Sequence, residues 1–175
     1  MILTASEIQK QVSNGSITLV PFQQEALNPN SYNYRLGEYL SEIDEGLIDP
    51  RKSPKLKEIK IPQQGYILQP NKLYLGHTLE IIGSMKYVTS LIGRSSLGRL
   101  GLFLQITADL GQLGSAHSWT LELKVVQPLR VYPGMKIGQV SFWKPVGEID
   151  KKYLEGYTSF SIPRHSKIHD QEKVT

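Results

Sequence analysis

The chain has 175 residues, of which 39% are hydrophobic and 21% are charged. This composition supports one folded core and excludes the apolar-poor, highly charged composition of disordered chains. No apolar run approaches the roughly 20 residues that a membrane span requires, and the N-terminal MILTASEIQK lacks the pattern of a secretion signal. We therefore expect a single domain over residues 1–175 that is cytoplasmic and makes no membrane contact.

The charge balance argues against a nucleic-acid partner. Twenty Lys and Arg residues oppose sixteen Asp and Glu residues, which leaves a net charge of +4, and the basic residues are scattered apart from a short cluster in residues 51–60. A small anion such as a nucleotide needs only a few local cations. The absence of cysteine excludes thiol nucleophiles and every zinc site that needs a thiolate.

The N-terminal segment predicts a short helix. Thr4 and Glu7 have the spacing of a capping box, Ile8 begins an apolar face, and Gly15 can end the helix in a left-handed conformation. These features predict a helix over residues 4–14. SITLVPF (16–22) then predicts a short strand, ALNPNSY (26–32) predicts a turn, and the charged, proline-containing stretch 44–62 predicts an exposed excursion.

From Tyr66 onward the pattern is typical of an all-β barrel or sandwich. Short segments rich in β-branched and aromatic residues recur between Gly, Pro and Asn. They are GYILQP, KLYLGHTLEII, KYVTSLIG, SWTLELKVV, LRVYPG and KIGQVSFWKP. Residues 148–175 are polar and weakly periodic, so we expect a tail that is flexible unless a ligand or a neighbouring subunit orders it.

The segment GRSSLGRLGL (93–102) is a candidate phosphate site. Arg94 and Arg99 flank two serines, and the glycines permit close approach of a ligand to the backbone. The glycine spacing differs from that of a Walker loop. A glycine-rich turn with two exposed arginines explains the same pattern equally well, so both interpretations stay open on the residues alone.

Glu122 lies in the predicted strand SWTLELKVV. Alternation places Thr120, Glu122 and Lys124 on one face and the apolar residues on the other. A solvated strand glutamate is the common explanation, and a catalytic role requires a specific partner.

Several segments together resemble the dCTP deaminase family of the dUTPase superfamily. They are MILTASEI (1–8), NPNSYNYRLG (28–37), LYLGHTLE (73–80), GRSSLGRLGL (93–102), ITA (106–108), TLEL (120–123) and YPGMKIGQVSF (132–142). The resemblance implies a mainly β fold, a distorted antiparallel β-barrel or jelly-roll of the dUTPase-like type with a short N-terminal helix. It also implies a homotrimer with active sites between subunits.

The resemblance assigns roles to individual residues. It implies that Glu122 moves protons, that Arg99 helps hold the reacting base and water, and that Ser95 lies near the catalytic centre. The implied substrate contacts are made by Arg94, Ser96, Ala108, Gln112, Tyr157 and Lys167.

The implied reaction is chemically consistent with these residues. Replacing the amino group at C4 of cytosine needs a base to accept a proton from water and an acid to release ammonia, and one carboxylate can do both. Most base deaminases activate water with zinc held by His and Cys, whereas this chain has no Cys, and His77 near Glu80 lacks further ligands. We therefore expect no bound zinc, and Mg²⁺ that enters with the triphosphate.

Some positions depart from the family pattern. Gln112 stands where the family has an Asp that, in dUTPases and bifunctional enzymes, positions the water attacking a phosphate; a glutamine is not an equivalent base. In the tail, GYTSF and SKIH, which contain Tyr157 and Lys167, differ from the usual KYQxQ-like and SRIH-like elements. We expect Arg35 to pair with a neighbouring carboxylate in a structural role, and His117 to be an exposed loop residue.

Three functional hypotheses follow. The leading one is metal-independent deamination of dCTP to dUTP and ammonia. The second is hydrolysis of dUTP to dUMP and pyrophosphate, alone or after deamination, which Gln112 opposes. The third is a nucleotide-binding trimer without catalysis.

Overall fold

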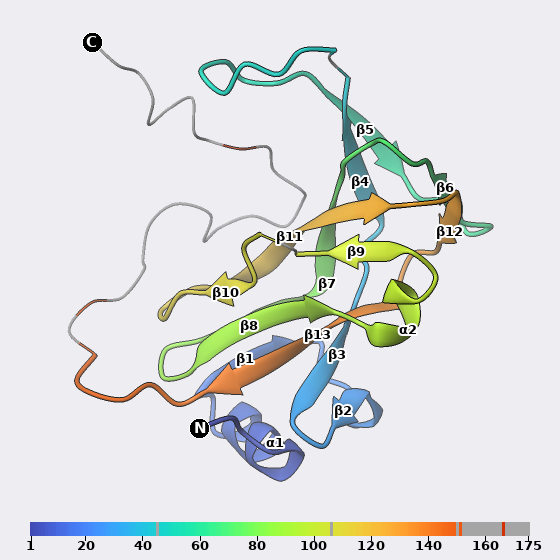
Figure 1. Ribbon diagram of the computed structural model, residues 1–175. Coiled ribbons are helices and arrows are strands. Elements are labelled where there is room, and N and C mark those ends of the chain that lie inside the picture. The colour runs from blue at the N-terminus through green and yellow to red at the C-terminus, as the bar shows by residue number, and fades with distance from the viewer. Residues whose placement is uncertain (45, 106, 150, 152–165, 167–175) are drawn as a thin grey trace.

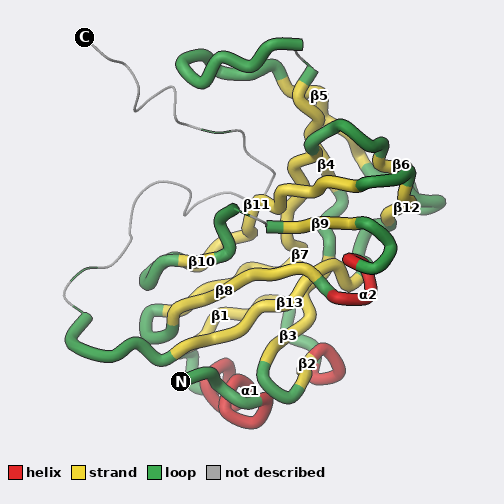
Figure 2. Tube along the Cα trace, in the orientation of Figure 1, coloured by secondary structure: helices red, strands yellow, loops and turns green. Residues whose placement is uncertain are grey.

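The computed structural model describes residues 1–44, 46–105, 107–149, 151 and 166, and strands dominate the described chain (Figures 1 and 2). The strands assemble into two larger antiparallel sheets and one two-stranded ribbon. The predicted tail from residue 152 onward, apart from Ser166, lies outside the described residues. No helix in the described ranges is long and apolar enough to cross a membrane.

The first sheet has the strand order β5-β4-β7-β11-β9, and β1 also pairs with β7. Its strands are β1 (Ile17–Val20), β4 (Tyr39–Ile43), β5 (Leu56–Lys60), β7 (Tyr74–Ser84), β9 (Leu102–Leu104) and β11 (Ala116–Val125). The long strands β7 and β11 form its centre, with a register shift between Ser118 and Thr120. This irregularity is a β-bulge or a similar distortion, which locally increases the twist of a sheet.

The second sheet has the order β10-β8-β13-β3-β2. Its strands are β2 (Leu27–Asn28), β3 (Ser31–Arg35), β8 (Val88–Gly93), β10 (Leu110–Gly111) and β13 (Lys136–Trp143). A small ribbon joins β6 (Tyr66–Leu68) to β12 (Leu129–Val131). All six segments predicted as strands after residue 65 are therefore confirmed within a few residues.

The N-terminal helix α1 (Ala5–Ser13) is confirmed, but its predicted capping-box bond is wrong. Thr4 occupies the N-cap position, yet its side chain does not cap the helix, and its Oγ1 lies 3.3 Å from Ser6 Oγ instead. Gly15, directly after the helix, has φ = 76°, as expected for a left-handed terminating glycine. A short 3-10 turn, η1 (Gln24–Ala26), follows β1.

The strand predicted in residues 16–22 is confirmed as β1, and the strands between β1 and β6 are the part of the fold that sequence patterns missed. β3 has the sequence SYNYR, in which every second residue is a tyrosine, and both Tyr32 and Tyr34 are fully buried. β5 lies inside the stretch 44–62 that we predicted as an excursion, and it pairs with β4 at the sheet edge. Its charged residues suit an edge strand, because the unpaired edge of such a strand faces water. The same charged residues remove the apolar pattern from which a strand would be predicted.

The buried core lies between the two larger sheets and includes several tyrosines. Its large fully buried side chains include Tyr32, Tyr34, Tyr74 and Phe142, surrounded by Leu, Ile and Val. The predicted structural ion pair of Arg35 is confirmed: its Nε donates to Glu80 Oε1 at 2.7 Å, and its backbone N–H donates to Glu80 Oε2 at 2.8 Å. Because Glu80 is fully buried, this pair ties β3 to β7 rather than facing a ligand.

Candidate active site

Glu122 lies on β11 where this strand leaves its pairing with β9. The last ladder pairs are Val125 with Leu102 and Leu123 with Leu104, so Glu122 is opposite the residue that follows β9. Leu121 and Leu123 on either side are buried while Glu122 is half-buried, which confirms the predicted alternation of faces. The buried Leu121 and Leu123 thus hold this part of β11 in place, and the Glu122 side chain lies on the more accessible face of the strand.

Gln105 is the residue opposite Glu122, and it contacts the backbone on two sides. Its side-chain Oε1 accepts a hydrogen bond from the Glu122 N–H at 2.9 Å. Its Nε2 donates to the carbonyl of Ala108 at 3.2 Å, and its own N–H points to the Glu122 carbonyl at 3.4 Å. The structure therefore links Glu122 with Ala108, the two residues for which the family resemblance implies proton transfer and contact with the edge of the base.

Sequence reasoning missed Gln105. The glutamine follows the apolar run GLFL, where a polar residue indicates only that a strand has ended. The observation that sets it apart is its backbone φ of 52°, which is unusual for a residue other than glycine, and no hydropathy pattern reports a dihedral angle.

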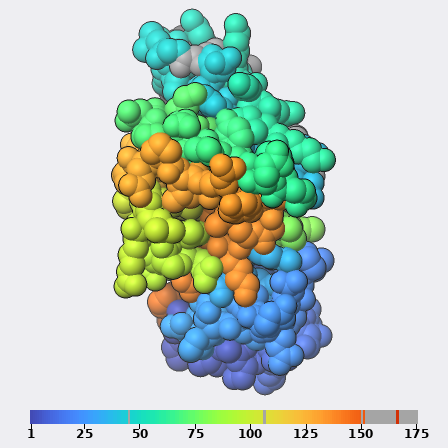
Figure 3. All heavy atoms as spheres, turned by 90° about the vertical axis from the view of Figure 1, so that its right-hand side faces the viewer, coloured from blue at the N-terminus to red at the C-terminus, as the bar shows by residue number. Residues whose placement is uncertain are grey.

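The predicted phosphate segment forms the short helix α2 (Ser95–Gly98). Arg94 precedes it and donates from Nη1 to the carbonyl of Lys136 at 3.3 Å, which holds the arginine beside the start of β13. Ser95, Ser96 and Arg99 are exposed. In Figure 3 the segment around α2 (yellow-green) lies at the surface next to the chain that precedes β13 (orange).

Within one chain, α2 and Glu122 lie at opposite ends of β9. Gly101, just after α2, is bonded through its carbonyl to the N–H of Val126, whereas Gln105 is opposite Glu122. The four residue steps between Gly101 and Gln105 correspond to about 13 Å of extended chain. The strand β9 therefore lies between the end of α2 and the residue opposite Glu122.

The remaining predicted contact residues fall into two groups. Gln112 is exposed in the turn after β10, and its carbonyl accepts a hydrogen bond from Ser115 Oγ at 3.1 Å, so its side chain faces outward from a stabilised turn. Tyr157 and Lys167 lie outside the described residues.

Two buried histidines flank the irregularity in the first sheet. The prediction that His117 is an exposed loop residue is wrong: it is buried on β11 and its ring lies 4.3 Å from that of Trp119. His77 is buried on β7, with Nδ1 3.2 Å from Ser118 Oγ. Burial lowers the pKa of both His77 and His117 below its ordinary value, so both favour the neutral form.

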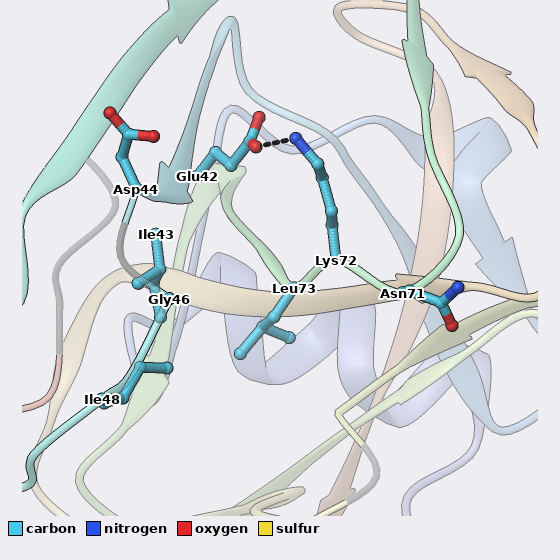
Figure 4. Close-up of a pocket in the computed structure, with 8 residues that line it drawn as sticks. All are labelled: Glu42, Ile43, Asp44, Gly46, Ile48, Asn71, Lys72 and Leu73. Carbon is cyan, nitrogen blue, oxygen red and sulfur yellow. Dashed lines mark hydrogen bonds and ion pairs between the residues drawn. The ribbon is translucent and has the colours of Figure 1, made fainter.

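The described residues contain no group of three or more His, Cys, Asp and Glu side chains that could hold a metal ion. A cavity of about 510 Å³ lies elsewhere, between the end of β4 and the turn before β7 (Figure 4). It is lined by Glu42 and Lys72, which form an ion pair, and by Asp44, Asn71 and apolar side chains. None of the predicted site residues lines this cavity.

The comparisons with known proteins agree with this architecture. A protein from Hathewaya histolytica named "dCTP deaminase, dUMP-forming" is 46% identical over 156 residues, which cover 89% of this chain and 90% of that protein. A protein of the same name from Leptospira biflexa is 44% identical over 151 residues, which cover 86% of each chain.

Among solved structures, the 2'-deoxycytidine 5'-triphosphate deaminase from Agrobacterium tumefaciens matches with a TM-score of 0.65 at 20% identity, over 81% of this chain and 47% of that longer chain. This likeness confirms the predicted fold class, a mainly β fold of the dUTPase-like type. The family model described as dCTP deaminase-like matches residues 2–145. A match over that much of the sequence shows that the chain belongs to the dCTP deaminase-like family.

Proposed function

We propose that the chain is an enzyme that deaminates dCTP, with Glu122 as the group that moves protons. The observation that carries this proposal is the family match over residues 2–145, to which the structure adds the link from Glu122 to Ala108 through Gln105. Water adds to C4 of the cytosine while Glu122 accepts one of its protons and passes it to N3. Glu122 then takes the proton of the new hydroxyl group and gives it to the amino group, so that the C4–N bond breaks and ammonia leaves as the uracil carbonyl forms.

The second part of the proposal is that each active site is shared between subunits of a homotrimer. The separation of α2 and Glu122 along β9 supports it, because α2 of one subunit can complete a site that contains Glu122 of another. Arg99 carries a permanent charge, so in that position it stabilises negative charge on the reacting base and does not act as a base itself. Ser95 helps orient the reacting end of the nucleotide.

The triphosphate of the nucleotide binds to the segment around α2. Arg94 is already oriented by the Lys136 carbonyl, and its remaining N–H groups can bind phosphate oxygens together with the Ser96 hydroxyl. Ala108 contacts the cytosine edge through its backbone, Gln112 contacts the sugar, and Tyr157 and Lys167 contact the phosphates from the tail. Mg²⁺ enters bound to the triphosphate and offsets its charge, and water activation proceeds without zinc.

Two products are compatible with deamination, and a different observation favours each. Gln112 offers an amide where phosphate hydrolysis would use a carboxylate, which favours release of dUTP. The names of the relatives, which specify a dUMP-forming enzyme, favour hydrolysis of dUTP to dUMP and pyrophosphate as a second step.

A nucleotide panel tests the proposal. The chain is incubated with dCTP, dCMP, CTP and dUTP in the presence of Mg²⁺, and ammonia and pyrophosphate are measured while the nucleotides are separated by chromatography. We expect ammonia from dCTP, unchanged by a zinc chelator. Accumulating dUTP supports the first product and dUMP with pyrophosphate the second, whereas tight dCTP binding without ammonia would overturn the enzymatic proposal in favour of a binding protein.

A further inference from the structure

Gln105 adopts a backbone conformation that a glutamine rarely adopts. Its φ of 52° lies in the left-handed region, and the other non-glycine residue with positive φ in the described chain is Asn71, at 62°. Asparagine tolerates this region comparatively well, whereas an unbranched longer residue costs about 1–2 kcal/mol there. A glycine at position 105 would adopt this φ without the cost, but it would have no side chain. We therefore look to the contacts of the Gln105 side chain for the interaction that offsets the strain.

The Gln105 side chain is buried and its amide is used at both ends. Only 8% of the residue is exposed. Its Oε1 accepts from the Glu122 N–H and its Nε2 donates to the Ala108 carbonyl. A backbone N–H can only donate and a carbonyl can only accept, so these two partners define the orientation of the amide.

The two partners belong to the two segments that carry the proposed chemistry. We propose that Gln105 is a positioning residue, which holds the Glu122 strand at a defined distance from the Ala108 peptide and thereby aligns the proton-transferring carboxylate with the pyrimidine edge. This inference rests on the proposed deamination. Nothing requires Gln105 to touch the nucleotide, because it acts through the backbone of both neighbours.

The alignment matters because proton transfer requires a carboxylate within hydrogen-bond reach of the attacking water. A displacement of about 1 Å can lower a rate by as much as 10²-fold. A small residue at position 105 would free both the strand end and the Ala108 carbonyl, so turnover would fall even where the fold survives.

Three variants test this inference in the full chain. Gln105→Gly relieves the backbone strain and removes both side-chain bonds. Gln105→Glu keeps an acceptor for the Glu122 N–H but cannot donate to Ala108, and it brings a second negative charge close to Glu122. Asn71→Gly is the matched control, because it makes the same relief of positive φ far from the proposed site. Each protein is assayed for ammonia release from dCTP over a range of pH, and its melting temperature is measured.

We expect Gln105→Gly to lose tenfold or more in kcat, a loss consistent with misalignment, while it melts within a few degrees of the parent. Gln105→Glu should raise KM for dCTP and move the acidic limb of the pH–rate profile to higher pH, because a neighbouring carboxylate disfavours the charged form of Glu122. Asn71→Gly should match the parent in both measurements.

Parent-like kcat in Gln105→Gly would overturn the inference. The inference would also be overturned if activity fell only in proportion to the amount of folded protein and the pH profile of Gln105→Glu did not move. A purely structural role of Gln105 predicts that result. A parent chain that releases no ammonia from dCTP would overturn the proposed function, and this inference with it, whereas an active parent with unaffected Gln105 variants would overturn the inference alone.

Discussion

The end of the β9–β11 pair and the helix α2 differ in how far a single chain organises them. Around Glu122, the Gln105 side chain is hydrogen-bonded to the backbone of Glu122 and of Ala108, and the neighbouring Leu121 and Leu123 are buried. Around α2, Ser95 and Arg99 are exposed, and Arg94 donates a side-chain hydrogen bond to the Lys136 carbonyl.

This difference indicates that the first region serves proton transfer and the second serves nucleotide binding. A preorganised acid lowers the cost of reaching the transition state, because no rearrangement is needed when proton transfer begins. Exposed serines and arginines instead gain their function when a charged ligand arrives and is held against them. Substitutions in the first region should therefore change the rate of chemistry, and those in the second should change nucleotide binding and assembly of the site.

The largest effect that we expect is from Glu122→Gln. Removing the group that accepts and returns the proton should lower ammonia release from dCTP by about 10²–10⁴-fold, while dCTP binding measured by calorimetry stays close to that of the parent. Glu58→Gln, which makes the same substitution at an exposed strand glutamate on β5, is the control and should leave the rate unchanged. A Glu122→Gln protein with full activity would remove this residue from the mechanism.

The second prediction concerns the sharing of sites between subunits. Arg99→Ala should be nearly inactive by itself, as should Glu122→Gln. When the two are unfolded together and refolded, a random trimer contains sites with both native residues, and about a quarter of the parent activity should return if each site takes one residue from each of two subunits. The mass of the parent in solution should be three times the chain mass of 19.7 kDa.

Separate refolding of each variant is the control for this mixing experiment. If activity does not return although ion-exchange chromatography, which separates the variants by charge, shows mixed trimers, the two residues act within one subunit. A monomeric parent that is fully active would contradict the shared site as well.

The sequence was most informative where apolar, β-branched and aromatic residues are concentrated between turn residues. β7, β11 and β13 are such segments, and all three were predicted within a few residues. β3 and β5 were missed because polar or charged residues interrupt their aromatic or aliphatic ones, and their pairing with other strands, rather than local propensity, makes them strands.

For the site, sequence motifs identified individual residues but not their placement. The resemblance led to Glu122 and Ala108, and the structure places them together. It could not reveal Gln105, whose proposed role depends on a dihedral angle and on two side-chain hydrogen bonds. It also assigned Ser95 and Arg99 to a centre shared between subunits, a prediction that the structure of one chain does not test.

A pair of glycine variants compares the packing of α2 with the packing between β10 and the side chains of β8 and β11. A Cβ at Gly111 would lie 2.0 Å from Thr89 Oγ1 and 2.7 Å from the Trp119 ring, whereas a Cβ at Gly98 in α2 meets nothing within 4 Å. We expect Gly111→Ala to lose about 1–3 kcal/mol of unfolding free energy through overpacking. Gly98→Ala should gain up to about 1 kcal/mol, because alanine has less freedom in the unfolded chain. Urea unfolding followed by circular dichroism measures both, and equal midpoints for the two variants would contradict the difference in packing.

The smallest expected effect is a pH dependence that originates in the buried region. Burial holds the pKa of His77 and His117 below the ordinary value of 6.5 in the folded chain, whereas in the unfolded chain both titrate near 6.5. The unfolded state therefore binds more protons as the pH falls below about 6.5, so the stability present above this pH should decrease towards the lower folded-state pKa values. Melting temperatures measured from about pH 7.5 to about pH 5.5 at constant ionic strength should fall, and the slope should be smaller in a His77→Gln/His117→Gln double variant. An equal slope in the parent and the double variant would show that other groups cause the dependence and that these two rings titrate alike in both states.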